Sequence, residues 1–132
     1  MPTHERSESL INISKRDLRS AIILSKDANP EVENSCYHCQ QSTEKALKAY
    51  LIHNNVLYKF THNLDILCTD CFNIDDTFIS LRTHCNILNS YSSETRYLDN
   101  CPLTEKDMNE AIELAEEVLS FVEEKIEKSN LS

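Results

Sequence analysis

The sequence of 132 residues contains no glycine, and this absence restricts the folds open to the chain more than any other feature. Glycine is the usual residue where the backbone needs a positive φ, as in phosphate-binding loops, tight β-hairpins and most β-bulges. A helical protein with short connections can do without it. The composition therefore favours an all-α chain, and the length suits one domain with one core.

Apolar residues recur at three- and four-residue steps in five segments, and no segment shows a sustained two-residue alternation. The expected helices cover about residues 9–28, a second stretch from Asn29 to about Tyr50, a short third after Thr61, a fourth from Ile74 to Ser92 and a fifth after Pro102. Four long helices and one short helix with brief connections predict an up-and-down antiparallel helical bundle.

Polar residues at the starts of these segments indicate where the helices begin. Asn29 could cap the second helix, with Pro30 in its first turn, and Thr61 could cap the third. Thr104 and Asp107 resemble a capping box at the start of the fifth.

The charge balance limits the classes of partner. Thirteen Lys and Arg against 22 Asp and Glu give a net charge of −9, the wrong sign for general nucleic-acid binding, so any phosphate contact needs a local patch. Residues 1–10 lack the apolar core of a signal peptide, and no apolar run approaches the ~18 residues of a membrane span. We expect a cytoplasmic protein whose six cysteines stay reduced.

Two Cys-x-x-Cys pairs invite a metal interpretation. Cys36 with Cys39, and Cys68 with Cys71, have the spacing of a four-thiolate zinc site. Both pairs also fall on apolar helical seams, where a free cysteine packs as a small apolar residue. We favour the core interpretation over zinc and expect these four and Cys85 to be buried, neither joined as disulfides nor bound to metal. The histidines are expected at the surface or as caps, and no cofactor is predicted.

A compact basic strip is expected on the second helix, opposite the cysteine seam. Gln41, Lys45 and Lys48 fall within one sector of the helix. The strip could be a solvated face in which Glu44 pairs with Lys48 at the i,i+4 spacing, or it could bind a phosphate or an acidic partner.

Arg96 stands 18 residues after Phe78, which is five helical turns, so it would project from the core seam if the fourth helix continued that far. It could pair with Glu94 or Asp99 as a structural pin, or line a polar cleft at a bundle end or a dimer interface.

Three stretches carry a resemblance to a known family. Within residues 37–51, the run Gln-Gln-Ser-Thr-Glu-Lys-Ala-Leu-Lys-Ala resembles the second-helix signature of HEPN domains. Residues 61–64, Thr-His-Asn-Leu, are similar to the Thr-His-Asp-Leu of that family, and residues 94–99 to its Arg-Tyr-Pro-Asp element, with Leu98 replacing the proline. The resemblance spans about residues 8–126, so we expect one HEPN-like domain over residues 1–132 with a core of about residues 8–128.

The resemblance implies a helical bundle that is commonly homodimeric. Many members are encoded beside a minimal nucleotidyltransferase as toxin–antitoxin pairs, and others bind nucleotides or are RNases. The RNase members carry Arg, four to six residues, then His. Here Arg82 and His84 are separated by one residue and no histidine follows Arg96. Without that histidine the pattern lacks its proton donor or acceptor.

We therefore expect a non-catalytic partner subunit of a nucleotidyltransferase-like protein, which could also bind a nucleotide. The residues expected to bind the partner or nucleotide are Gln41, Lys45, Lys48, Arg96 and Tyr97. The alternatives are a divergent RNase toxin that uses Arg96 and, ranked last, a metal-binding regulatory domain.

A homodimer is expected from the resemblance and from the fourth helix. Ile87 and Tyr91 lie beside its core stripe and could extend its apolar face outward.

Overall fold

The computed structural model describes residues 3–91 and 102–131, and it confirms the all-α helical bundle. The described helices are α1 (Thr3–Ser25), α2 (Val32–His53), α3 (Leu64–Phe72), the 3₁₀ helix η1 (Asp76–Leu81), α4 (Arg82–Asn89) and α6 (Glu105–Leu131). Arg96 and Tyr97 lie outside the described residues. None of the described helices is long and apolar enough to span a bilayer.

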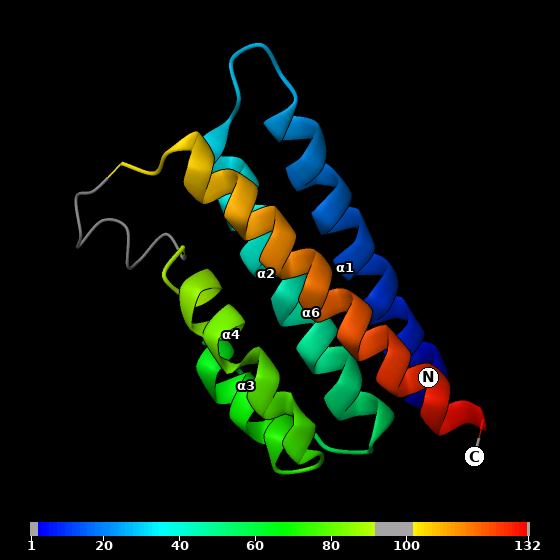
Figure 1. Ribbon diagram of the computed structural model, residues 1–132. Helices are drawn as coiled ribbons and strands as arrows, with labels where there is room; N and C mark the ends of the chain where they lie inside the picture. Colours follow the sequence, from blue (N-terminus) through cyan, green and yellow to red (C-terminus); the bar gives the residue numbers. More distant parts are fainter. Residues whose placement is uncertain (1–2, 92–101, 132) are drawn as a thin grey trace.

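Helix α2 is the central element. It runs antiparallel to α1, while α6 lies along both, and α3 and α4 form a shorter antiparallel pair beside them (Figure 1). Helix α2 contacts α1, α3, α4 and α6. Its buried residues consequently extend around much of its circumference rather than along one stripe. The start of α1 and the end of α6 lie at the same end of the bundle (Figure 1).

Small side chains spaced seven residues apart join α1 to α2. Along the antiparallel pair, the facing couples are Ser7 with Ala49, Ser14 with Ser42 and Ala21 with Ser35. All six side chains are buried. Small residues at each layer let two helix backbones approach closely, because the distance between helix axes depends on the side chains at the contact.

Each layer of this seam also contains a hydrogen bond across the two helices. Ser7 Oγ donates to the carbonyl oxygen of Ala49 at 3.0 Å, and Ser35 Oγ donates to that of Ala21 at 2.8 Å. Ser14 and Ser42 lie in the middle layer, where each hydroxyl is within 2.9 Å of the other's carbonyl oxygen. The seam thus satisfies its buried hydroxyls with backbone acceptors, as buried polar groups require.

An aromatic cluster fills the core on another side of α2. The Phe78 ring of η1 is fully buried, with its centroid 4.5 Å from that of Tyr50 on α2 and 5.0 Å from that of Phe121 on α6. These contacts join three elements that are distant in sequence, and aromatic pairs at such separations add to the burial of apolar area.

The cysteines lie in the core, as the seam pattern predicts. Cys36, Cys39, Cys68, Cys71 and Cys85 are buried and are not joined as disulfides. Among residues 3–91 and 102–131, no group of three or more His, Cys, Asp or Glu side chains is placed to hold a metal ion.

Two of the predicted helix caps are wrong and one is confirmed. The predicted cap at Asn29 is wrong, because α2 begins after Glu31, whose side chain makes no capping hydrogen bond. The predicted cap at Thr61 is also wrong, because Asn63 caps α3 by accepting from the backbone N–H groups of Asp65 and Ile66. The capping box of Thr104 and Asp107 is confirmed, with both reciprocal hydrogen bonds present.

The expected helices at residues 9–28 and from Ile74 onward have different limits. Helix α1 begins earlier, at Thr3, and ends at Ser25. The segment from Ile74 is divided into η1 and α4, and the Asp75 side chain caps η1 by accepting from the Thr77 N–H. Tyr91 is buried and Ile87 packs against the chain's own core, so these side chains do not form the outward apolar face expected for a dimer.

The end of α2 shows how the chain turns without glycine. Asn55 has a φ of 60°, the left-handed region that usually favours glycine. Its N–H donates to the Ile52 carbonyl oxygen, and the Val56 N–H donates to that of Leu51. This is a Schellman motif in which asparagine takes the position that glycine usually occupies.

Replacing Ser14 by leucine tests the seam, because the buried site has no room for the larger side chain. Overpacking of this kind usually costs about 1–3 kcal/mol, and we expect a loss of at least this size in the free energy of unfolding, measured by urea denaturation. Ser9→Leu on the exposed side of α1 is the matched control and should change stability little. Equal losses in the two variants would contradict the close packing of the seam.

Candidate functional site

A buried carboxylate on α2 is the centre of a polar network that joins α2 to the segment before α3. Glu44 has a side chain with no exposed area, and two lysines of the same helix, Lys45 and Lys48, contact it. An unpaired carboxylate at such a position would be strongly unfavourable, so its contacts determine how the surrounding side chains lie.

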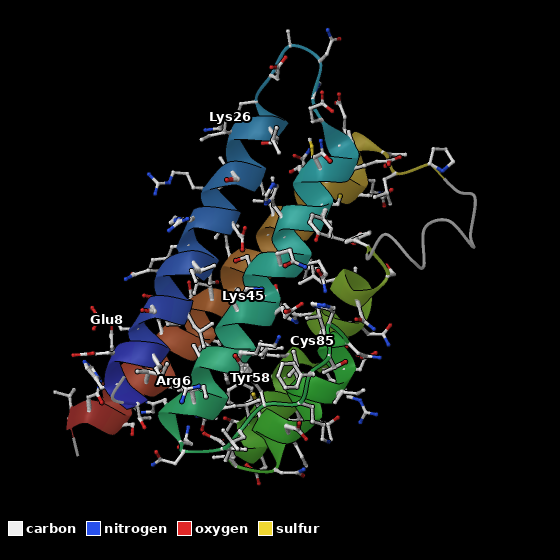
Figure 2. The ribbon with its side chains drawn as sticks, turned by 180° about the vertical axis from the view of Figure 1, so that it is seen from behind. Arg6, Glu8, Lys26, Lys45, Tyr58 and Cys85 are labelled. Carbon is white, nitrogen blue, oxygen red and sulfur yellow. The ribbon has the colours of Figure 1, made fainter. Side chains whose placement is uncertain are left out.

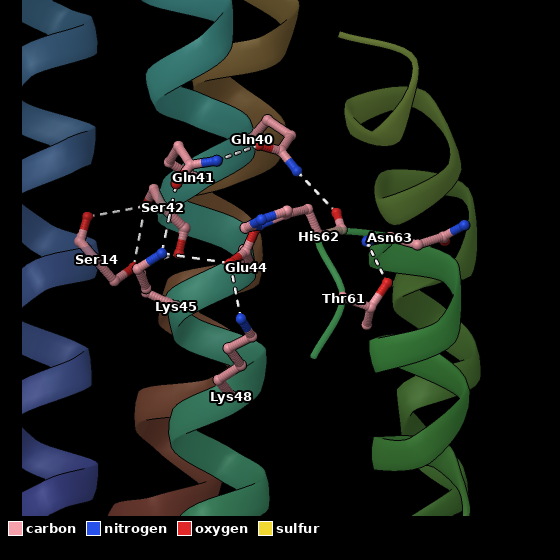
Figure 3. A network of polar contacts seen from close by, with 10 residues as sticks. All are labelled: Ser14, Gln40, Gln41, Ser42, Glu44, Lys45, Lys48, Thr61, His62 and Asn63. Atoms are coloured by element: carbon pink, nitrogen blue, oxygen red, sulfur yellow. Dashed lines mark hydrogen bonds and ion pairs between the residues drawn. The ribbon is translucent and has the colours of Figure 1, made fainter. Parts of the chain in front are cut away.

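Three cationic or ionisable side chains surround Glu44 (Figure 3). Lys48 Nζ donates to Oε2 at 2.9 Å, and Lys45 Nζ lies 3.3 Å from the same oxygen. The other oxygen, Oε1, lies 2.9 Å from Nδ1 of His62. Both carboxylate oxygens are therefore occupied by hydrogen-bond partners, which offsets the cost of removing the charge from water.

The segment between α2 and α3 brings His62 to Glu44. After α2 ends, this segment runs back along the helix, so that His62 lies beside a residue well before the helix end (Figure 3). Gln40 on α2 holds the backbone there, because its Nε2 donates to the His62 carbonyl oxygen at 3.0 Å. The following residues start α3, and the Leu64 N–H donates to Asn89 Oδ1 of α4 at 2.9 Å.

The network keeps Glu44 ionised. Burial alone would raise the pKa of this carboxyl, but the hydrogen bonds from Lys48 and His62, together with the charges of Lys45 and Lys48, outweigh burial and lower it. Hydrogen bonds to the charged form and nearby positive charges both favour ionisation.

Gln41, Lys45 and Lys48, the three site residues predicted on α2, lie together in the structure. Lys45 Nζ is 3.4 Å from Gln41 Oε1, and the Glu44–Lys48 pair has the expected i,i+4 spacing. Yet the strip is not a freely solvated face, since the side chains of Lys45 and Lys48 are only 23% and 12% exposed. Lys48 also lies over the Tyr58 ring, 4.8 Å from its centroid, a cation–π contact.

Gln40, Glu44 and His62 are the members of the network that the sequence analysis did not assign to the site. His62 was expected among surface or capping residues; its side chain is 80% exposed, but one ring nitrogen is committed to Glu44. The sequence feature that could have identified these residues is the pair of family-like motifs at residues 37–51 and 61–64. The fold places the two motifs in direct contact through Gln40, Glu44 and His62.

Two further histidines also pair with carboxylates of a neighbouring helix. His38 Nδ1 on α2 lies 3.3 Å from Asp17 Oδ1 on α1, and His84 Nε2 on α4 contacts Glu117 on α6. These pairs link elements of the bundle, so these histidines connect helices rather than cap them.

The exposed edge of the network has a defined chemical capacity. When Nδ1 of His62 donates its proton to Glu44, Nε2 carries a lone pair directed away from the carboxylate and could accept a proton or a hydrogen bond. The lysine ammonium groups have three donors each, and those not used on Glu44 could bind an anion. Two lysines against one carboxylate leave the network locally positive on an acidic protein.

Comparison with protein families and solved structures gives a consistent result. The HEPN domain family model matches residues 7–125 of the chain. The crystal structure of TT1696 from Thermus thermophilus is 27% identical in sequence, with a TM-score of 0.79, and the match covers 91% of this chain and 98% of that one. The crystal structure of ST0689, described as an archaeal HEPN homologue, is 25% identical, with a TM-score of 0.75 and coverage of 92% and 98%. The search of curated proteins found no match.

Glu44→Gln tests the network through the pH dependence of stability. The amide keeps the size of the side chain but loses the charge, and we expect the free energy of unfolding at pH 7 to fall by roughly 1–3 kcal/mol. Because the folded pKa of Glu44 lies below its ordinary value of 4.5, its contribution is present above about pH 4.5 and is lost as the pH falls further.

The difference in the free energy of unfolding between wild type and Glu44→Gln, measured by urea denaturation, should therefore become smaller below pH 4.5. Glu113→Gln, at an exposed position of α6, is the matched control and should leave both stability and its pH profile nearly unchanged. A constant difference from pH 7 to pH 3 would show that Glu44 does not act through its charge.

Proposed function

The chain belongs to the HEPN domain family, and we propose that within this family it is a non-catalytic partner subunit. Its partner would be a nucleotidyltransferase-like protein, in a pair of the toxin–antitoxin type, and its own assembly would be a homodimer. The basic edge of the Glu44 network, formed by Lys45, Lys48 and His62, would bind the partner or a nucleotide phosphate. Arg96 and Tyr97, outside the described residues, belong to the same proposal.

The non-catalytic proposal rests on the contacts of Lys45 and Lys48 with Glu44. Both ammonium groups donate to Glu44, so they are positioned by a buried partner and part of their charge is compensated. Such groups suit binding of an anionic group, because the ammonium donors that Glu44 does not use remain available to a phosphate or a carboxylate. The absence of any histidine after Arg96 in the sequence supports the same conclusion.

Exposed apolar side chains support an assembly role. Leu57 is 81% exposed and Phe60 is fully exposed, both on the segment between α2 and α3. The same segment also carries His62, the network residue that contacts Glu44. Large exposed apolar side chains beside polar groups are common where proteins bind one another. We assign Leu57 and Phe60 to assembly in place of Ile87 and Tyr91.

Binding to a small nucleotidyltransferase, if one is encoded beside this chain, tests the proposal. Alanine at Lys45 and Lys48 should weaken the complex at least about tenfold in titration calorimetry, since a charged contact at an interface is typically worth more than 1.4 kcal/mol when truncated. Lys106→Ala, on the exposed start of α6, is the control and should bind as wild type does. Both variants must first show wild-type helicity, because Lys48 also supports Glu44. Unchanged binding by the double variant would remove these lysines from the site.

A second candidate function, a divergent RNase, is favoured by one observation. His62 is exposed and is oriented by a buried carboxylate, an arrangement that general bases often have. It could supply the proton acceptor that the Arg-x4-6-His pattern lacks here.

An RNA cleavage assay separates the two functions. We expect the purified protein to leave RNA intact. A positioned acid or base typically accelerates such a reaction by about 10² to 10⁴, and no histidine follows Arg96 to supply one. Cleavage that disappears in both His62→Ala and Arg96→Ala, but persists in His53→Ala, would replace the partner proposal by the RNase one.

A further inference from the structure

A cavity of about 400 Å³ lies between α3 and the η1–α4 segment. This part of the bundle, which carries Cys85, stands beside α2 on the side away from α1 (Figure 2). The cavity shares no lining residue with the Glu44 network. Its volume is near the lower end of the roughly 300–1,000 Å³ that small-molecule sites have, so it suits a small ligand.

Polar residues of two neighbouring helices form the walls of the cavity. Arg82 and Asn86 stand one turn apart on α4, and Thr69 and Asn73 stand one turn apart on α3 and its C-terminal cap. Residues four positions apart lie on the same side of a helix, so each pair belongs to one face. The two faces meet at the cavity and offer it hydroxyl, amide and guanidinium groups.

Apolar side chains line the same cavity. Phe72 of α3 and Ile79 of η1 remain 38% and 55% exposed. A ligand that covers them removes apolar area from water, which is favourable. The site therefore rewards a molecule that has an apolar part as well as a polar part.

Opposite charges line the cavity without neutralising each other. Arg82 forms no hydrogen bond or ion pair with another of residues 3–91 and 102–131, so these two lining residues, Asp65 and Arg82, are not paired. The Asp65 carboxylate accepts one long hydrogen bond, 3.4 Å, from Asn89 Nδ2 to its Oδ2. Both charges are thus available to a ligand.

We propose that the cavity binds a free α-amino acid with a large apolar side chain, such as leucine or phenylalanine. The ligand's carboxylate pairs with Arg82, because the planar guanidinium matches a carboxylate with two parallel hydrogen bonds. Its ammonium group pairs with Asp65, and its side chain covers Phe72 and Ile79. The proposal requires neither the proposed partner nor the Glu44 network.

The charges of the cavity favour this class of ligand over others. A phosphate or nucleotide would place its negative charges beside Asp65 on a chain of net charge −9. A simple amine would face Arg82, and a carboxylic acid would leave Asp65 without a cation. A zwitterion with an apolar side chain satisfies both charges and the apolar wall together.

A nuclear magnetic resonance titration of the ¹⁵N-labelled full chain with phenylalanine or leucine tests the proposal. We expect saturable shifts of the backbone amide signals of Thr69, Asn73 and Asn86, with a Kd of about 1 mM or tighter. The signals of the outer side of α1, such as that of Arg16, should not shift.

Three analogues test each part of the ligand on the wild-type protein. The compound 3-phenylpropionate lacks the ammonium group, phenylalaninamide lacks the carboxylate, and glycine lacks the side chain. Each should bind at least about tenfold more weakly than phenylalanine, as expected for the loss of one charged contact or of the apolar contact.

Two variants then assign each charge. Arg82→Gln should bind phenylalanine and phenylalaninamide with nearly equal affinity, and Asp65→Asn should no longer prefer phenylalanine to 3-phenylpropionate. A loss of folding alone would not exchange these preferences. Arg16→Gln, at an exposed position of α1, is the matched control and should keep the preferences of the wild type.

The wild-type titrations decide the proposal. It is overturned if about 10 mM phenylalanine and leucine cause no saturable shift at the cavity. It is equally overturned if 3-phenylpropionate or inorganic phosphate binds as tightly as phenylalanine, which would indicate a site for simple anions. These outcomes need no variant, so they hold even if Asp65→Asn, in the first turn of α3, impairs folding.

Discussion

The close contact between α1 and α2 is the constraint on which the rest of the bundle depends. Its three layers of serine and alanine let the helices approach closely, and each layer contains a cross-helix hydrogen bond. With α1 packed tightly on one side, and α3, α4 and α6 on the others, α2 is enclosed over much of its length. A carboxylate in the middle of such a helix can stay charged only if nearby side chains satisfy both its oxygens. The burial of Glu44 therefore follows from the packing, and the positions of Lys45, Lys48 and His62 follow from the burial.

Because the buried Glu44 needs partners for both its oxygens, two motifs that are separate in sequence lie together in the fold. Gln40 and Glu44 come from the run at residues 37–51, and His62 comes from the run at residues 61–64. The first motif holds both the backbone and the ring of the second. The motifs thus have a structural role in fixing the return of the chain to α3, whatever further role their exposed edges have in binding. Lys48 supports Glu44 and keeps only 12% of its side chain exposed, so the proposed binding role would depend on the same structural contact.

The sequence predicts this fold well wherever local patterns decide it. The seam of α2, the burial of the five cysteines and the capping box of Thr104 and Asp107 depend on residues within a few turns of one another. The division of the fourth segment was not predictable, because Asp75 caps η1 in a stretch whose apolar spacing alone suits a continuous helix. The pairing of Glu44 with His62 was not predictable for another reason: it depends on the path of the segment after α2, which no periodicity encodes. The lysine strip was identified by spacing, but its partial burial required the positions of Glu44 and Tyr58.

The enclosure of α2 has a consequence for how the molecule opens. The α3–α4 pair is short and lies on one side of the bundle, and it is attached through its buried core side chains and the polar contacts near His62. Helix α1, by contrast, is attached along its whole length. We therefore expect local opening to be unequal: the α3–α4 pair should detach while α1, α2 and α6 stay together, whereas the amide protons of α2 should become accessible only when the whole bundle unfolds. The slowest-exchanging part of the protein should then be the same helix that carries Glu44.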